Sequence, residues 1–163
     1  MADRKSKVFS KVFDGTRKVV CVDYDKEKEA FYYHFVKNQR SNGYRQIIIT
    51  SELMIKIIDS FIKKDFILYN IEFMEEDDDY FDIQAIIKNE SKLKENRVKL
   101  IKKLEFLAEE TSIEIKRIYF KGKYNNLFTK FFIQANGILA VNEESYLAIE
   151  KEIIKIIEEG MFK

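Results

Sequence analysis

The most constraining feature of this sequence is a repeated rhythm. β-rich runs, separated by turn signals, lead into stretches of apolar residues at helical spacing. The clearest such stretch follows Ser51, an expected N-cap, and places apolar residues at i, i+3 and i+4 positions from Leu53 to Ile62. The same spacing predicts a helix over residues 91–110, capped by Ser91, and another over residues 143–159. This rhythm is typical of an α+β protein whose hairpins are each followed by a helix.

The strands are expected where β-branched and aromatic residues gather between turn signals. Those strands are residues 7–13, 19–24, 30–37, 46–50, 66–74, 80–88, 113–121 and 128–134, with a short extended piece at 138–141. Turns are expected at residues 14–15, 25–28, 41–43, 125–126 and 136–137. The predicted string is therefore ββββα-ββα-ββα, with mainly antiparallel sheets. Residues 1–65 would form the first unit, and residues 66–163 would pack with it as one compact domain.

The charge of the chain is small in total but uneven along it. The net charge is +1, which argues against a generic polybasic nucleic-acid binder. Residues 1–65 carry a net +5, residues 66–90 a net −7 and residues 91–163 a net +3. A basic face can therefore exist beside the acidic run from Glu75 to Asp79, which we interpret as a solvated hairpin tip.

The motifs of the common catalytic and cofactor sites are missing from the sequence. Cys21 is the single cysteine and His34 the single histidine, and neither has partner residues at motif spacing. The five glycines are scattered, so no phosphate-binding loop is present, and no EF-hand spacing surrounds the acidic run. We expect no enzyme activity, no cofactor, no metal and no membrane span, and a cytoplasmic location.

Aromatic residues are concentrated from Phe31 to Phe35, and the cations Lys37, Arg40 and Arg45 follow them. As a strand, this segment would place Phe31, Tyr33 and Phe35 on one face of a sheet. Open sheets with exposed rings and flanking cations stack the bases of single strands. A sheet covered on both sides, by a helix and by a partner, would instead hide these rings.

The stretch from Val8 to Lys64 also resembles a PUR repeat, the ββββα unit of purine-rich-element binding proteins. The matching features are the run Val8–Phe13, Arg17 ahead of the strand Val19–Tyr24, the aromatic run Phe31–Val36, the basic turn Lys37–Arg45 with Asn42-Gly43, the strand Gln46–Thr50 and the helix ending Ile58–Ile62. The resemblance implies a pair of curved sheets, built from two repeats or from a homodimer, that bind single-stranded DNA or RNA.

Three functions remain open at this point. The first is single-stranded nucleic-acid binding. It would use rings of Phe31, Tyr32, Tyr33 and Phe35, phosphate contacts from Lys11, Arg17, Lys18, Lys37, Arg40 and Arg45, and an extended track of Lys116, Arg117, Lys121 and Lys123. The second is a protein-binding regulator or inhibitor, of the kind that mobile elements encode, whose acidic run mimics nucleic-acid charge towards a protein partner. The third is an enzyme with a cryptic site.

Overall fold

One antiparallel sheet runs through the whole chain in the order β2-β1-β7-β6-β5-β4, and β3 pairs with a further part of β1. The computed structural model describes residues 3–24, 31–75, 78–88, 97–111 and 113–162. The elements are β1 (Asp3–Phe13), β2 (Thr16–Asp23), α1 (Tyr32–Ser41), β3 (Arg45–Gln46), α2 (Ser51–Lys63), β4 (Ile67–Phe73), α3 (Asp78–Lys88), α4 (Arg97–Glu110), β5 (Ile115–Tyr124), β6 (Leu127–Gln134), β7 (Ile138–Asn142), the 3-10 turn η2 (Glu143–Ser145) and α5 (Tyr146–Phe162). The predicted α+β class with antiparallel strands is confirmed. Because β1 pairs with β7, residues from both ends of the chain share this sheet.

The two long hairpins turn where the sequence predicts. Asp14 and Gly15 have φ of 49° and 79°, and Asn125 and Asn126 have φ of 52° and 65°. Two-residue hairpin turns need positive φ at both central positions, which Asn, Asp and Gly tolerate best. The β1–β2 and β5–β6 registers follow directly from these turns.

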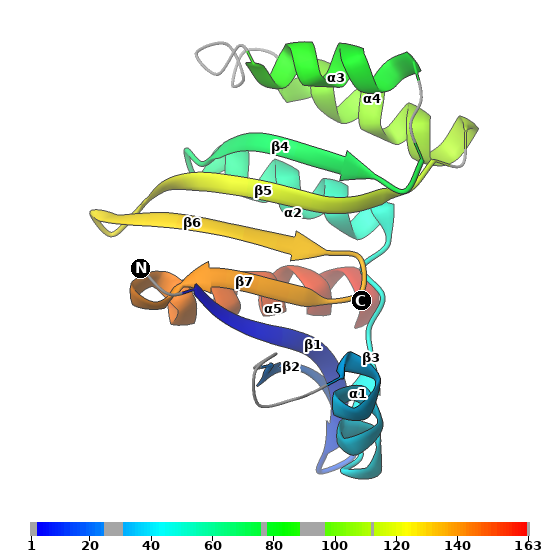
Figure 1. Cartoon of the computed structure of the whole chain (residues 1–163), viewed down its shortest axis with the longest axis vertical. Coiled ribbons are helices and arrows are strands. Elements are labelled where there is room, and N and C mark those ends of the chain that lie inside the picture. The colour runs from blue at the N-terminus through cyan, green and yellow to red at the C-terminus, as the bar shows by residue number, and fades with distance from the viewer. Residues whose placement is uncertain (1–2, 25–30, 76–77, 89–96, 112, 163) are drawn as a thin grey trace.

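The core lies between one face of the sheet and the helices α2 and α5, which Figure 1 shows behind the strands. Phe61 of α2 is fully buried, and its ring centroid lies 5.5 Å from that of Phe120 and 4.8 Å from that of Phe131. The inward side chains of α5 are Ile149, Ile153 and Ile157, at the spacing of one helix face. The predicted helices at 51–64 and 143–159 are therefore confirmed.

The start of α2 differs from the prediction in one detail. Thr50 is the N-cap, and its Oγ1 accepts a hydrogen bond from the Leu53 amide at 3.2 Å. Ser51 is the first helical residue, and its Oγ accepts from the Ile115 amide at 2.9 Å. The serine therefore joins α2 to β5 instead of capping the helix.

The predicted strand over residues 30–37 is wrong, because this segment forms most of α1. Phe35 is buried, with its ring centroid 4.8 Å from Tyr24 and 6.0 Å from Phe9. Phe31 and Tyr33 are 65% and 69% exposed. Of Phe31, Tyr33 and Phe35, only Phe35 enters the core. A half-buried strand would bury all three, because every second residue of a strand points to the same face, so this burial pattern fits a helix instead. The turn at Ser41–Gly43 exists, but it ends this helix, with Gly43 at φ 90°.

Of the fourth predicted strand, over residues 46–50, only Gln46 is in a strand, as the second residue of β3. Beyond β3, the Ile49 amide donates to the Ala135 carbonyl at 2.7 Å, outside any strand. The first 64 residues therefore run ββαβα instead of ββββα. The element order implied by the resemblance to a PUR repeat is not the order that the structure has.

The predicted strand over residues 80–88 is also wrong, because residues 78–88 form α3. Ile83 and Ile87 are buried four residues apart, which is the spacing of one helix face. Gln84 Nε2 donates to the Ile71 carbonyl at 3.1 Å, and this bond fixes α3 beside β4. Figure 1 shows α3 and α4 along that edge of the sheet. The predicted turn at 25–28, the cap at Ser91 and part of the acidic run, residues 76–77, lie outside the described residues.

Candidate nucleic-acid interface

Figure 1 shows α2 and α5 on one face of the sheet. The opposite face of β5 and β6 carries a cluster of aromatic rings. Tyr119 and Phe132 are direct cross-strand partners, and their ring centroids lie 5.6 Å apart at 55°. The Tyr69 ring, at a bulge in β4, lies 5.7 Å from that of Tyr119. All three rings are half-buried, so each keeps part of its surface open to solvent. Cross-strand aromatic pairs of this kind stabilise a sheet and present π-surface to a ligand.

Cations surround these rings. The Arg117 guanidinium carbon lies 4.6 Å from the Phe132 ring centroid. Lys121 Nζ and Lys130 Nζ lie 5.6 Å and 5.3 Å from the centre of the Tyr69 ring. Along the same face, Lys123 pairs with Phe128, which is 54% exposed. We call this surface the aromatic face, and its members are Tyr69, Arg117, Tyr119, Lys121, Lys123, Phe128, Lys130 and Phe132.

Hydrogen bonds hold the centre of the aromatic face in place. Arg117 Nη1 donates to the Tyr119 hydroxyl at 2.7 Å, and Nη2 donates to Gln134 Oε1. The Tyr119 hydroxyl in turn donates to Glu72 Oε1. Burial, and next the hydrogen bond to Glu72, raise the pKa of Tyr119 above its ordinary value, so the phenol is neutral at pH 7. The rings and the guanidinium are therefore preorganised before any ligand arrives.

Three of the four cations predicted on this strand lie on the aromatic face: Arg117, Lys121 and Lys123. Lys116 does not, because neighbouring strand residues point to opposite faces. The rings themselves were missed, although residues 117–123 and 128–134 alternate with a period of two in the sequence. That alternation, with a ring or a cation at every second position except Gln134, was the signal that could have found them.

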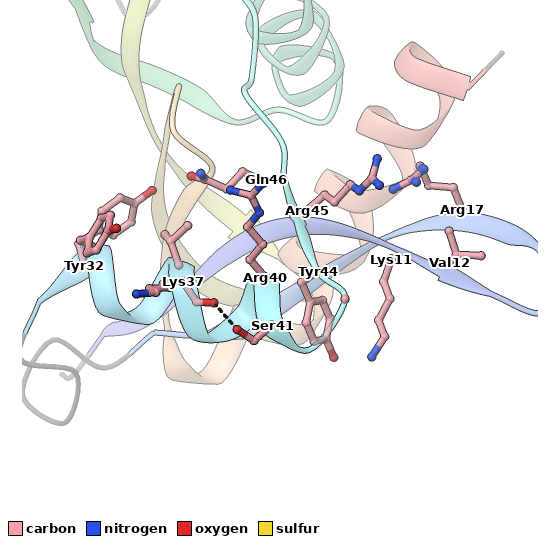
Figure 2. A pocket seen from close by; sticks show the side chains of 13 residues that line it. Lys11, Val12, Arg17, Tyr32, Lys37, Arg40, Ser41, Tyr44, Arg45 and Gln46 are labelled. Carbon is pink, nitrogen blue, oxygen red and sulfur yellow. Dashed lines mark hydrogen bonds between the residues drawn. The ribbon is translucent and has the colours of Figure 1, made fainter.

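A second basic surface lies at α1, where most of the other predicted residues meet around an open hollow of about 1220 Å³ (Figure 2). We call this hollow the α1 pocket. Among its lining residues are Lys11, Arg17, Tyr32, Tyr33, Lys37, Arg40, Tyr44 and Arg45. No aspartate or glutamate is among the lining residues that the structure describes.

Three of the predicted residues do not belong to the α1 pocket. Phe35 is in the core, as described above. Phe31 precedes α1 and is exposed without lining the hollow. Lys18 is exposed on β2, opposite Lys11 across the strands, and it also lies outside the lining. The predicted stacking strand of Phe31, Tyr32, Tyr33 and Phe35 is therefore corrected to a helix that presents only Tyr32 and Tyr33 to the pocket.

Lys7 lies where the two surfaces approach each other. It is fully buried on the α1 side of β1, its Nζ donates to the Asn136 carbonyl, and it lies 5.4 Å from the Tyr32 ring centroid. Burial lowers the pKa of Lys7 from 10.5 to about 8. A buried ammonium without a carboxylate partner among the described residues destabilises the folded state. The stability of the protein therefore depends on the protonation of Lys7, and so on pH.

The chemically reactive side chains form no site of their own. His34 is exposed on α1 between the rings of Phe31 and Tyr33. Burial raises the pKa of the Cys21 thiol to about 12, so the thiol is protonated and a poor nucleophile at neutral pH. Within the described ranges, no group of three or more His, Cys, Asp or Glu side chains is placed to hold a metal ion.

Comparison with known proteins gives no relative for this chain. No protein-family model, no curated protein and no solved structure matches it. None of the helices in the described part of the chain is both long and apolar enough to span a bilayer. The function must therefore be argued from the aromatic face and the α1 pocket themselves.

Proposed function

We propose that the protein binds single-stranded nucleic acid through the aromatic face. The observation that carries the proposal is the cross-strand pair Tyr119–Phe132, joined by Tyr69, on a sheet face that no described helix covers. Bases of a single strand stack on such rings because every base has a π-face, whereas a duplex keeps its bases stacked inside.

The cations of the aromatic face complete the chemistry. Arg117, Lys121 and Lys130 lie within cation–π distance of the same rings that would receive the bases. A base stacked on a ring therefore brings its own phosphate close to a positive charge. Single-strand binders combine these two elements, a row of rings and a positively charged track for the backbone.

The direct test is a fluorescence-anisotropy titration with labelled single-stranded DNA, single-stranded RNA and a duplex of the same sequence, at two salt concentrations. We expect one or both single strands to bind more tightly than the duplex, with affinity falling as salt rises. Equal binding of single strand and duplex would assign the effect to charge alone and would remove the stacking role. No binding of any single strand at low salt would refute the proposed function.

A further inference from the structure

Two arginines extend to the same side of β1 in the α1 pocket. Arg45 of β3 is the direct partner of Ser10, and Arg17 of β2 is the direct partner of Val12. Residues 10 and 12 lie on one face of β1, and residue 11 lies on the other. Figure 2 agrees, because the side chains of Arg17 and Arg45 extend to one side of β1 and that of Lys11 extends to the other.

Arg17 and Arg45 flank β1 on the same face of the sheet. Arg17 Nη1 donates to Ser10 Oγ at 2.9 Å, and Ser10 is the residue directly opposite Arg45. Arg40 lines the same hollow from the α1 side of the sheet, and in Figure 2 its side chain reaches towards Gln46, the direct partner of Phe9. Because β2 and β3 flank β1, the positive charges of Arg17 and Arg45 share one face of the sheet with one strand between them, and both attract an anion placed there.

No carboxylate of the described residues neutralises them. Glu158 of α5 lies on that side of β2, but its Oε1 accepts from the Val19 amide, and no ion pair joins it to Arg17 within the described residues. Elsewhere the chain does pair its arginines, as Arg4 pairs with Asp23 and Arg97 with Asp59. The arginines of the α1 pocket thus keep guanidinium donors available to a ligand.

We propose that the α1 pocket is a second ligand site, which binds the terminal phosphates of a nucleotide through Arg17, Arg40 and Arg45. The planar guanidinium group matches the oxygens of a phosphate with paired donors. Three tyrosines, Tyr32, Tyr33 and Tyr44, also line the hollow on the side of β1 that carries α1 and Lys11, so a nucleotide whose phosphates lie at Arg17 and Arg45 reaches across the edge of β1 to stack its base there. The hollow, at about 1220 Å³, exceeds the needs of inorganic phosphate and accommodates a whole nucleotide.

The same ligand chemistry has two sources, a free nucleoside polyphosphate or the phosphorylated end of a nucleic-acid strand. The first arm of the test is calorimetric titration with ATP and with inorganic triphosphate. The second arm compares single strands that carry a 5′-phosphate, a 3′-phosphate or only hydroxyl ends. Both arms use the wild type, the double variant Arg17→Gln/Arg45→Gln, and Lys99→Gln/Lys102→Gln on α4 as a control that removes the same charge.

We expect ATP, or a terminal phosphate, to bind the wild type and the control alike. The Arg17/Arg45 variant should lose at least about tenfold in affinity for ATP, or the whole advantage of the phosphorylated end. The affinity for ATP should exceed the affinity for inorganic triphosphate, because the tyrosine rings also contribute to binding the base. An effect in the first arm identifies a free nucleotide, and an effect in the second identifies a strand end. If neither ATP nor a terminal phosphate binds with dependence on these arginines, the proposal is overturned.

Melting curves separate a binding role from a structural one. Removing two like charges should leave the Tm of the Arg17/Arg45 variant unchanged or raised. ATP at ~100 times its Kd should raise the Tm of the wild type by about 5–10 °C and leave the variant unmoved. Arg40→Gln is the second variant, because Arg40 is exposed on α1, and it must also weaken binding. Strands with hydroxyl ends test the aromatic face alone, so ATP binding without strand binding would reject the proposed function and keep this site.

Discussion

The aromatic face and the α1 pocket are both basic and both contain rings, but they hold their cations in different ways. On the aromatic face, Arg117 is fixed by hydrogen bonds to Tyr119 and Gln134 and lies over the Phe132 ring. In the α1 pocket, Arg40 and Arg45 extend from a helix and a two-residue strand without an ion-pair partner among the described residues. Lys11 Nζ there lies over the Tyr44 ring, 4.3 Å from its centroid.

This difference suggests a division of labour. Rings that are fixed across three strands offer a flat surface of constant spacing, which suits stacking of successive bases. Guanidinium groups with open donors suit a concentrated negative charge, such as a terminal phosphate. The predictions below test whether the two surfaces act separately, and they run from the largest expected effect to the smallest.

The largest effect is expected at Lys7, between the two surfaces. Its pKa is about 8 in the folded protein and about 10.5 when unfolded, so between these values the unfolded chain binds more protons and stability rises with pH. As pH rises through this range, the free energy of unfolding of the wild type should increase by on the order of 3 kcal/mol. Lys7→Met should lack this increase, because methionine does not titrate. Urea unfolding at intervals from pH 7 to pH 10 measures it.

The comparison must be made as the difference between the wild type and Lys7→Met. The raised pKa values of Cys21 and Tyr146 act in the opposite direction, since their protonated forms stabilise the fold and that contribution is lost as pH rises. Those contributions cancel in the difference. If the free energy of unfolding changed with pH in the same way in the wild type and in Lys7→Met, Lys7 would have the same pKa in the folded and the unfolded chain, which would contradict this prediction.

Phe132→Ala is the change that separates the two surfaces most clearly. Loss of this ring should weaken binding of a single strand by about 1–3 kcal/mol, with little change in salt dependence. ATP binding at the α1 pocket should stay the same. Anisotropy and calorimetric titrations measure the two affinities.

Phe106→Ala is the matched control, because Phe106 is 49% exposed on α4, away from both surfaces. It should leave both affinities unchanged. Melting curves must show that Phe132→Ala remains folded at the temperature of the titration. Equal affinities of Phe132→Ala and the wild type for a single strand, with the fold intact, would remove this ring from the site.

The lysines should give a smaller, purely ionic effect. Lys121→Gln with Lys130→Gln should reduce the magnitude of the salt slope for a single strand by about 0.7 per lost phosphate contact. Lys37→Gln in the α1 pocket should not change that slope for a strand with hydroxyl ends. If the salt slope changed by the same amount per removed lysine in both variants, one continuous track for the strand would cross both surfaces.

The sequence predicted the elements that local signals define. The Asp14-Gly15 and Asn125-Asn126 turns, the strands on either side of them and the apolar stripe of α2 all follow from residues close together in the chain. The segments at 30–37 and 80–88 were mispredicted because rings and isoleucines are frequent in both strands and helices. Their state depends on which residues tertiary packing buries, as Phe35 against Tyr24 and Ile87 in the core demonstrate.

The candidate site was predictable in part for a similar reason. Basic residues could be chosen from composition, and Arg17, Arg40, Arg45 and Arg117 do line one of the two surfaces. The pairing of Tyr119 with Phe132 depends on register, and the approach of Tyr69 depends on a bulge in β4. Neither the bulge nor the order of strands in the sheet can be read from one sequence. The alternation in β5 and β6 can therefore mark Tyr119 and Phe132 as outward-facing, but it cannot show that these rings lie together with Tyr69 on the aromatic face.

The central claim is that bases stack on the aromatic face, and the resonances of its rings test this most directly. Aromatic proton–carbon NMR spectra recorded during titration with a short single strand carrying hydroxyl ends would follow Tyr69, Tyr119 and Phe132 individually. Stacked bases shift ring protons strongly, so we expect saturable shifts at these three residues and none at the Tyr33 ring of the α1 pocket. Shifts confined to Tyr33 and its neighbours, or none at the three rings while the strand is bound, would contradict the account.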